Sequence, residues 1–527
     1  MEISPKLFFG LAAVGILVNA SGLLLPIMEP DGALYATIAK NMVLSGDYVN
    51  LMLEGNDWLD KPHLPFWITA LSYNIFGINS FAYKLPAFLF WLAGAIYLFQ
   101  FAKRILNVKA AQIAVLVYLS AEHLILSNND VRAEPYLTGL IIAGTYHYFR
   151  GYTEERLTHF ILGGFMVALG VMTKGPFFGI IVIGGLFTEW IIKKDWNQFR
   201  SYRLWISLLV AGVAILPELV SLYIQFDQHP EKWVFGRQQV SGIRFFFIDS
   251  QFGRFFNTGP IKGKGDPFFY LHTVLWAFLP WSITLVLYCF SRFRLKGYIG
   301  KPGLYLSGAS ALIGFVLFSL SGFQLPHYLN ILFPYFSVIV ASYLITMSGA
   351  GERAFKVSST ILFWIIAVGI TALVFLLKPA FSYYIAILIF CTSIAIYALT
   401  KRASSRNIFI RLFLQVMLLN IFLNAVFYPF LFTFQSGMHA AKHLQQAGNR
   451  NRVYMFYSMP ADYAFEFYST NPILRVNTIT NNQINFPADF FTTQSMADSL
   501  MLDNRYRIEI LKVFDHFRIT RLTGKFV

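Results

Sequence analysis

Long apolar runs, separated by short polar or basic segments, make up most of this chain. An apolar helix of roughly 17 to 25 residues is long enough to cross the ~30 Å hydrocarbon core of a membrane. By this criterion the sequence predicts about thirteen membrane spans. Their centres are Ile16, Phe90, Val117, Ile142, Val167, Ile183, Leu209, Val286, Ile313, Val338, Ile366, Leu388 and Leu419. The expected fold class is an all-α polytopic membrane protein whose transmembrane region covers residues 1–434.

A polar loop over residues 28–83 interrupts this pattern between the first two spans. Asp31 is expected to cap a short helix, because Leu34 and Ile38 recur at helical spacing and Gly46 can end the helix. A second amphipathic helix is predicted over residues 64–76. Helices of this kind lie along the membrane surface. The loop therefore predicts juxtamembrane helices at the water–lipid boundary, with Asp60 and Lys61 directly before the second one.

Two further regions depart from the apolar pattern. The loop over residues 224–269 is long and mixes charges with a dense cluster of Phe, which favours an ordered segment at the membrane interface. From residue 435 onward, helix-like runs alternate with strand-like ones. The helical runs are 438–446 and 461–468, and the strand-like runs are 452–457, 508–514 and 518–522. The sequence thus predicts a small α/β domain over residues 435–527.

Composition and charge agree with a membrane protein. Of 527 residues, 56% are hydrophobic and only 13% are charged. A formal charge of +15 would suit a nucleic-acid partner, but Lys and Arg collect after the even-numbered spans, which places those loops and Lys6 in the cytoplasm. These clusters are Lys103 to Lys109, Arg150 and Arg156, Lys193 to Arg203, Arg292 to Lys301, Arg353 and Lys356, and Lys401 to Arg411. The 28–83 loop, the 224–269 loop and the C-terminal region are therefore expected to face outward, and no nucleic-acid partner is expected.

Several polar groups recur at the predicted outer edge of the spans. Asp130 and Arg132 follow the third span, and charges near hydrocarbon usually line a polar cavity or pair with one another. The alternative is that Asp130 caps a helix and Arg132 pairs with Glu134 or a lipid phosphate. Lys174 either reaches up to the interface or meets a phosphate.

The same choice applies to three residues further along the chain. Arg254 has the planar fork that suits phosphate oxygens, or it anchors an anionic lipid. His327 and Tyr328 can hydrogen-bond a head group, although interfacial Tyr is also common as a membrane anchor.

Competing chemistries find little support in the sequence. It contains no phosphate-binding glycine loop, no zinc-spaced Cys/His pairs and no serine elbow. The two cysteines, Cys289 and Cys391, lie within predicted spans, so no disulfide framework is expected. A transporter or flippase of lipid-linked sugars remains an alternative, although such proteins usually place their site near the middle of the bilayer. A structural envelope-assembly factor is a third possibility.

With these residues in view, the chain resembles the GT-C superfamily of polytopic glycosyltransferases, and within it the bacterial lipid A aminoarabinose transferases and the protein O-mannosyltransferases. The resemblance rests on five outward segments in order. These are Asp31 to Ala36, Asp60 to Trp67, Thr173-Lys174-Gly175, Arg254-Phe255 with Pro267 to Tyr270, and Leu325 to Tyr328. Leu34, His63 and Gln324 depart from the aminoarabinose transferase pattern, which leaves the acceptor open.

The resemblance implies transfer of a sugar from a polyprenyl-phosphate-linked donor to a lipid, glycan or protein acceptor. It implies a multi-pass protein of the bacterial cytoplasmic membrane, with its N-terminus in the cytoplasm and its C-terminal domain outside. Asp31 is expected to act as the base and Asp130 to position sugar or acceptor. The substrate-binding residues would be Tyr35, Asp60, Lys61, Arg132, Lys174, Arg254, His327 and Tyr328. Asp60 is expected either to orient Lys61 or to bind a divalent cation, the one possible cofactor.

Overall fold

The computed structural model describes residues 1–294, 303–479, 484, 486–503 and 505–519. Lys296 and Lys301 of one predicted basic loop, and the end of the predicted strand 518–522, lie outside the described residues.

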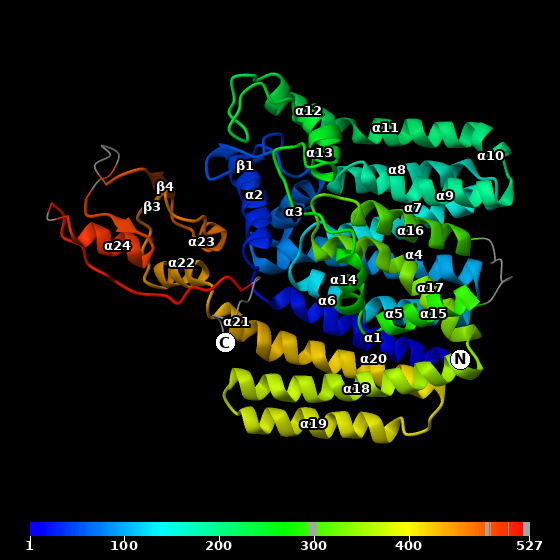
Figure 1. Ribbon diagram of the computed structural model, residues 1–527. Coiled ribbons are helices and arrows are strands. Elements are labelled where there is room, and N and C mark those ends of the chain that lie inside the picture. Colours follow the sequence, from blue (N-terminus) through cyan, green and yellow to red (C-terminus); the bar gives the residue numbers. More distant parts are fainter. Residues whose placement is uncertain (295–302, 480–483, 485, 504, 520–527) are drawn as a thin grey trace.

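A bundle of roughly parallel helices forms the body of the molecule (Figure 1). Its helices are α1 (Pro5–Ser21), α4 (Ser80–Ile105), α5 (Val108–Leu119), α6 (Glu122–Asn129), α7 (Glu134–Thr153), α8 (Leu157–Lys174), α9 (Phe177–Lys193), α11 (Tyr202–Leu222), α14 (Phe269–Ala277), α15 (Ser282–Arg294), α16 (Leu304–Ser319), α17 (Phe333–Thr346), α18 (Gly349–Leu377), α19 (Ser382–Leu399) and α20 (Ser405–Phe422). In the described part of the chain, eight helices are long and apolar enough to cross a membrane, or nine if the bent pair α5 and α6 counts as one span. The chain is a multi-pass membrane protein, and the figure of about thirteen spans stays a prediction.

Several predicted spans fall below that length or hydropathy. The helix α9 has 17 residues, and α16 has 16. The pair α5 and α6 is bent by 51° at the break between them. The broken pair α5 and α6 is almost fully buried in the bundle, whereas α9 and α16 each leave large apolar side chains exposed on one face.

Both predicted helices of the first loop are present. They are α2 (Asp31–Ser45), which ends at Gly46 with a φ of 72°, and α3 (Leu64–Phe76). The prediction that Asp31 caps α2 is wrong, because Pro30 occupies the cap position and Asp31 is the first helical residue. Its carboxylate instead pairs with Arg132. Between the two helices lies the hairpin of β1 (Met52–Leu53) and β2 (Asn56–Asp57).

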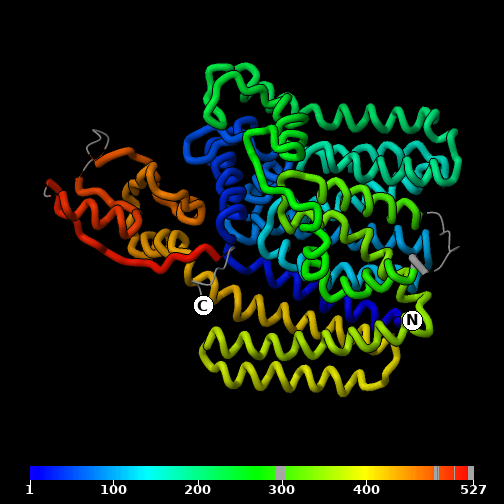
Figure 2. Tube along the Cα trace, in the orientation of Figure 1, coloured from blue at the N-terminus to red at the C-terminus, as the bar shows by residue number. Residues whose placement is uncertain are grey.

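The first loop and the C-terminal region lie together at one end of the bundle, and the N-terminus lies at the other end (Figure 2). The helix α2 runs across the direction of the long helices (Figure 1). Near α2 lie the outer-loop elements α12 (Gly242–Arg244) and α13 (Phe252–Phe255), preceded by the π-helical turns Tyr223–Asp227 and Phe245–Asp249. The basic segment around α10 (Asn197–Arg200) lies at the opposite end. The separation agrees with the sidedness predicted from the Lys and Arg clusters.

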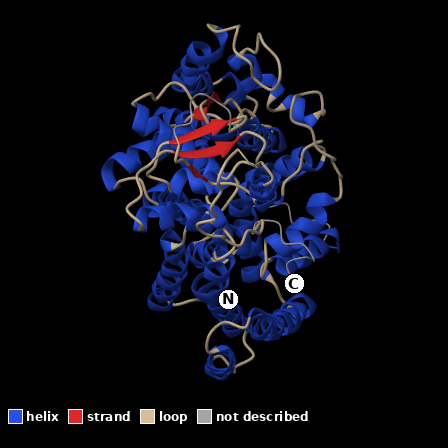
Figure 3. Cartoon of the chain, turned by 90° about the vertical axis from the view of Figure 1, so that its left-hand side faces the viewer, coloured by secondary structure: helices blue, strands red, loops and turns tan. Residues whose placement is uncertain are grey.

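The C-terminal region, residues 435–519, combines helices with a small sheet (Figure 3). The sheet has the order β4-β3-β5, and all its strands are parallel. Its elements are α22 (Ser436–Gln446), β3 (Val453–Phe456), α23 (Tyr463–Tyr468), β4 (Ile473–Val476), β5 (Asp489–Phe490) and α24 (Gln494–Met501), and α21 (Tyr428–Phe432) leads into them. The prediction of a strand over 508–514 is wrong, because this segment is extended but pairs with no strand in the described part of the chain.

Side chains of the C-terminal region hold the segment that leads into α2. The Gln435 side chain accepts from Glu29 N at 3.2 Å and donates to Ile27 O at 3.0 Å. The Ile27 N–H donates to the Tyr468 hydroxyl at 2.8 Å. The Lys40 ammonium donates to three carbonyl oxygens at the end of α23, at 2.7 to 2.9 Å. The position of α2 therefore depends on residues more than 400 positions later in the chain.

Candidate functional site

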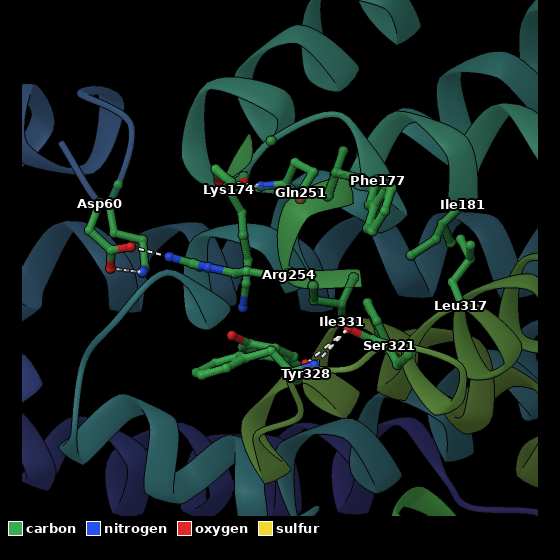
Figure 4. Close-up of a pocket in the computed structure, with 16 residues that line it drawn as sticks. Asp60, Lys174, Phe177, Ile181, Gln251, Arg254, Leu317, Ser321, Tyr328 and Ile331 are labelled. Atoms are coloured by element: carbon green, nitrogen blue, oxygen red, sulfur yellow. Dashed lines mark hydrogen bonds and ion pairs between the residues drawn. The ribbon is translucent and has the colours of Figure 1, made fainter. Parts of the chain in front are cut away.

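Asp60 lies between two cations in a cavity near the first loop (Figure 4). One carboxylate oxygen of Asp60 pairs with Lys61, and the other pairs with Arg254 on α13. Burial alone would raise the pKa of Asp60, but the charges of Lys61 and Arg254 hold it below its usual value. We call Lys61 and Arg254 the cation clamp. A carboxylate already occupies it in this structure.

His63 holds the clamp segment against the membrane helices. Its ring and the Glu218 carboxylate are both fully buried, with Nδ1 and Oε1 3.0 Å apart. The backbone N–H of His63 donates to the other Glu218 oxygen at 2.9 Å, and its Nε2 lies 2.9 Å from Val49 O. These bonds tie the loop to α11 at a point three residues after Asp60. The departure from the family pattern at His63 thus has a structural role in this chain.

A second group of charges lies at the start of α7 and the end of α8. The Lys174 ammonium pairs with the buried Glu134 carboxylate. It also lies 3.9 Å from the centre of the Tyr328 ring. The His327 Nε2 is 3.8 Å from the same Glu134 carboxylate. Lys174 therefore does not extend away toward the interface as a lone cation, and Figure 4 shows it beside Arg254 and above Tyr328.

Arg132 joins two carboxylates in a third group. Its Nη1 lies 2.6 Å from Asp31 Oδ2, and its Nη2 lies 2.8 Å from Asp130 Oδ2. Burial raises the pKa of Asp130, and Arg132 partly offsets that rise. The predicted alternative pairing of Arg132 with Glu134 is wrong, since Glu134 pairs with Lys174. A Cβ placed on Gly32 would lie 3.2 Å from Asp130 Oδ1, so a small residue after Asp31 lets the two acids share one Arg.

The three groups act on one another electrostatically. The Lys61 pKa is lowered by burial, and the charges of Asp60 and Asp31 both work against that lowering. Burial raises the pKa of Tyr35, and the nearby charges of Asp31 and Asp60 raise it further. The paired groups comprise four carboxylates and four cations. Any anion that binds here must therefore compete with carboxylates for cations that are already paired.

The cavity around the clamp is narrow and largely apolar on its inner side. Its free volume is about 70 Å³. Five of the predicted site residues line it: Asp60, Lys61, Lys174, Arg254 and Tyr328. Apolar side chains form the rest of the wall, among them Phe177, Phe178, Ile181, Leu317, Phe318 and Ile331. Asp31, Tyr35, Asp130, Arg132 and His327 lie beside this cavity and are not among its lining residues.

Lys84, Glu134 and Gln251 belong to this neighbourhood and were not predicted as site residues. Gln251 Nε2 donates to the backbone oxygen of Lys174 at 2.8 Å. The signal for Glu134 was present, because an acid directly before Pro135 at the start of an apolar helix is unusual in a membrane protein. Lys84 is fully buried, and its ammonium donates to Gly22 O and Pro26 O at 3.0 and 3.1 Å. Neither the contact between Gln251 and Lys174 nor the contacts of Lys84 could be predicted from the sequence, because each joins residues at least 58 positions apart.

No group of three or more His, Cys, Asp or Glu side chains within the described ranges is placed to hold a metal ion. Both Asp60 oxygens are paired with cations. The geometry thus favours the interpretation in which Asp60 contacts Lys61 over the one in which it binds a divalent ion.

Comparison with known proteins gives consistent matches. The profile of a family described as dolichyl-phosphate-mannose-protein mannosyltransferase matches residues 60–220. The structure of ArnT from Cupriavidus metallidurans bound to undecaprenyl phosphate superposes with a TM-score of 0.71 at 20% identity, and the match covers 90% of this chain and 86% of that one. The apo form of the same protein gives 0.70 at 21% identity, with 89% and 86% covered.

Curated relatives point to the same group. An undecaprenyl phosphate-alpha-4-amino-4-deoxy-L-arabinose arabinosyl transferase of Edwardsiella ictaluri is 26% identical over 67% of this chain. The enzyme of the same name from Shewanella sediminis is 26% identical over 64% of it. The chain resembles the GT-C glycosyltransferases. It spans 62% and 59% of the length of these two relatives.

Proposed function

We propose that this protein transfers a sugar from a polyprenyl-phosphate-linked donor to a lipid, glycan or protein acceptor at the outer face of the bacterial cytoplasmic membrane. The observation that carries the proposal is the clamp. Lys61 and Arg254 are 193 positions apart in the sequence, yet both meet Asp60 in one cavity. That cavity has cations at one side and apolar side chains at the other. A phosphate attached to a hydrocarbon chain has the matching chemistry.

The reaction needs cations more than a second acid. The acceptor oxygen forms a bond to the anomeric carbon of the sugar, and the bond from that carbon to the phosphate oxygen breaks. The lipid phosphate changes from a diester with one negative charge to a monoester that carries up to two. Lys61 and Arg254 stabilise the charge that develops, with Lys174 and Tyr328 next to them. No acid need protonate the leaving group, unlike the alkoxide released in glycoside hydrolysis.

Asp31 is the best placed of the four carboxylates to accept the acceptor proton. Its side chain is 40% exposed, against 13% for Asp130, 25% for Asp60 and 3% for Glu134. Arg132 contacts its Oδ2. Its Oδ1 has no hydrogen bond to any described residue, so this oxygen is available to the acceptor. In this proposal Asp130 and Arg132 hold Asp31 and contact the sugar or acceptor, and Tyr35 and His327 bind the substrate beside them.

The direct test follows a labelled sugar. Purified protein is incubated with a radiolabelled sugar-phosphate polyprenol and candidate acceptors, in detergent, where there is no compartment to cross. We expect label to appear in an acceptor, and Asp31→Asn to reduce that rate by about 100-fold, the scale of a lost general base. Donor binding should stay close to the parent value. Parent-level transfer by this variant would remove Asp31 from the mechanism.

One observation favours a flippase of lipid-linked sugars as the second candidate. The span formed by α5 and α6 is broken at its outer third and bent by 51°, and broken helices are common in transporters. The paired charges, however, gather at the outer end of the bundle rather than at its middle. Movement of a labelled lipid between vesicle leaflets, without any covalent transfer, would favour the flippase.

A further inference from the structure

A second cavity, of about 880 Å³, lies where α2 meets the C-terminal region. Its walls come from α2, the β1–β2 turn, the start of α4 and residues 445–475. Figure 1 shows these elements together at one end of the bundle. Lys40, which lines it, is nine residues from Asp31 and about half a turn away around the helix. The cavity shares no lining residue with the clamp cavity, and the proposed reaction assigns it no role.

The charged groups in this cavity are already paired with one another or hydrogen-bonded to the backbone. The Lys40 ammonium donates to the carbonyl oxygens of Glu466, Phe467 and Ser469. Arg475 pairs with both Glu54 and Glu466. Two cations and two carboxylates therefore cancel. A phosphate or carboxylate ligand would meet two like charges and would find no cation free.

The polar groups that remain without a hydrogen bond to another described residue are all neutral. The side-chain oxygen of Asn41, the Gln445 amide, the Tyr457 hydroxyl and the Thr470 hydroxyl line the cavity without a hydrogen bond to another described residue. An apolar ligand would remove water from these groups and replace none of its hydrogen bonds, which is costly. A ligand rich in hydroxyl groups supplies donors and acceptors to all four.

The position of the cavity limits how such a ligand arrives. Asn79 and Ser80 form part of its floor, and Ser80 is the first residue of the span α4. A ligand seated here lies directly above the membrane surface. Tyr457 is 54% exposed, so its ring offers a flat apolar face beside the polar groups of the cavity. Amides, hydroxyls and an exposed aromatic ring together match the two faces of a sugar ring.

We infer that this cavity binds the neutral saccharide part of the acceptor, at a subsite separate from the reacting atoms. The inference rests on the proposed function, because the ligand is an acceptor only if the protein transfers a sugar. Binding of the saccharide itself can be measured without turnover. No bond forms or breaks in this cavity. Its role is to hold the acceptor near the membrane while the reacting hydroxyl reaches Asp31.

The test uses the full chain in detergent and a neutral tetrasaccharide, maltotetraose, as the probe in saturation-transfer NMR and calorimetry. We expect saturable binding. Thr470→Trp, which fills the cavity, should weaken it about tenfold, and so should Tyr457→Ala, which removes the aromatic ring and its hydroxyl. Tyr202→Ala, at an exposed tyrosine on the other end of the bundle, is the matched control and should bind like the parent. Inorganic phosphate should not displace the probe.

Three results would overturn the inference. They are equal tetrasaccharide binding in the parent and in both cavity variants, displacement by phosphate at low ionic strength, and binding of neutral tetra-alanine in place of the sugar. Polyprenyl phosphate binding at the clamp, measured in the same variants, should not change. If the probe binds here but no acceptor ever receives a sugar, the proposed function fails and the cavity stands. If Thr470→Trp and Tyr457→Ala both transfer sugar with the parent kcat/KM, the cavity proposal fails and the function stands.

Discussion

The carboxylate of Asp60 competes with the donor phosphate for the cation clamp, and Asp60→Asn should expose that competition. Both oxygens of Asp60 are paired, one with Lys61 and one with Arg254. A phosphate that contacts both cations must come within about 5 Å of this carboxylate. Two unit charges at that distance repel by roughly 3 kcal/mol at an effective dielectric constant of about 20.

The expected gain is smaller than this Coulomb figure. The Asp60 side chain is 25% exposed, so water and salt reduce the repulsion. Asn also keeps one oxygen that accepts a hydrogen bond from either cation. We expect Asp60→Asn to bind polyprenyl phosphate tighter by about 1 to 2 kcal/mol, or about 5- to 30-fold in Kd. The difference should shrink as salt is raised from 50 to 500 mM.

The assay is a titration of the protein in detergent with polyprenyl phosphate, followed by microscale thermophoresis. Asp266→Asn is the control, because this exposed acid lies in the 224–269 loop, which also carries Arg254, and has no cation partner among the described residues. Weaker binding by Asp60→Asn would refute the competition. It would mean that Asp60 orients Lys61 for the phosphate, or that it holds a divalent ion which bridges to it.

Three further outcomes follow from the same contacts. Lys61→Ala and Arg254→Ala should each weaken polyprenyl phosphate binding by about tenfold or more in that titration, and parent-like binding by both would place the phosphate elsewhere. Glu134→Gln should lower the melting temperature by several degrees, because it leaves Lys174 partly buried without its counter-ion, at a cost of up to about 3 kcal/mol; added polyprenyl phosphate should restore part of the loss in a thermal-shift assay. Burial and the neighbouring Asp462 raise the pKa of Glu29 to about 9, so this group stabilises the docked C-terminal region fully below its ordinary pKa of 4.5 and loses that contribution as pH rises through about 9. Hydrogen exchange at residues 27–31 should therefore show faster local opening at pH 9.5 than at pH 7, after correction for the intrinsic rate, and Glu29→Gln should remove most of that pH dependence.

Local patterns predicted the elements of the first loop well. The helix predicted over 64–76 coincides with α3, and the helix that begins near Asp31 ends at Gly46 as expected. Both depend on spacing and end signals within about fifteen residues. The run over 508–514 alternates like a strand, but alternation alone cannot supply a partner, and the sheet that forms uses β3, β4 and β5 instead.

The candidate site shows where such reasoning ends. The sequence suggested that Lys61, Lys174, Arg254 and Tyr328 meet, and all four line one cavity. It did not suggest that Asp60 already fills the clamp. The bond between Arg254 and Asp60 joins residues 194 positions apart, so its existence depends on how the outer loop folds over the bundle. The roles assigned to these residues remain predictions until the variants above are measured.

The hydrogen bonds that join residues 27–29 and Lys40 to the C-terminal region have a consequence for biosynthesis. A ribosome makes residues 27–40 hundreds of residues before it makes residues 435–468. The growing polypeptide can insert most of its hydrophobic helices before these contacts exist, so Asp31 stays loosely placed until residues 435–468 have been exported. A nascent protein interrupted before that point would have its membrane helices inserted but its site around Asp31 incomplete. Contact with the donor lipid at that stage would be unproductive.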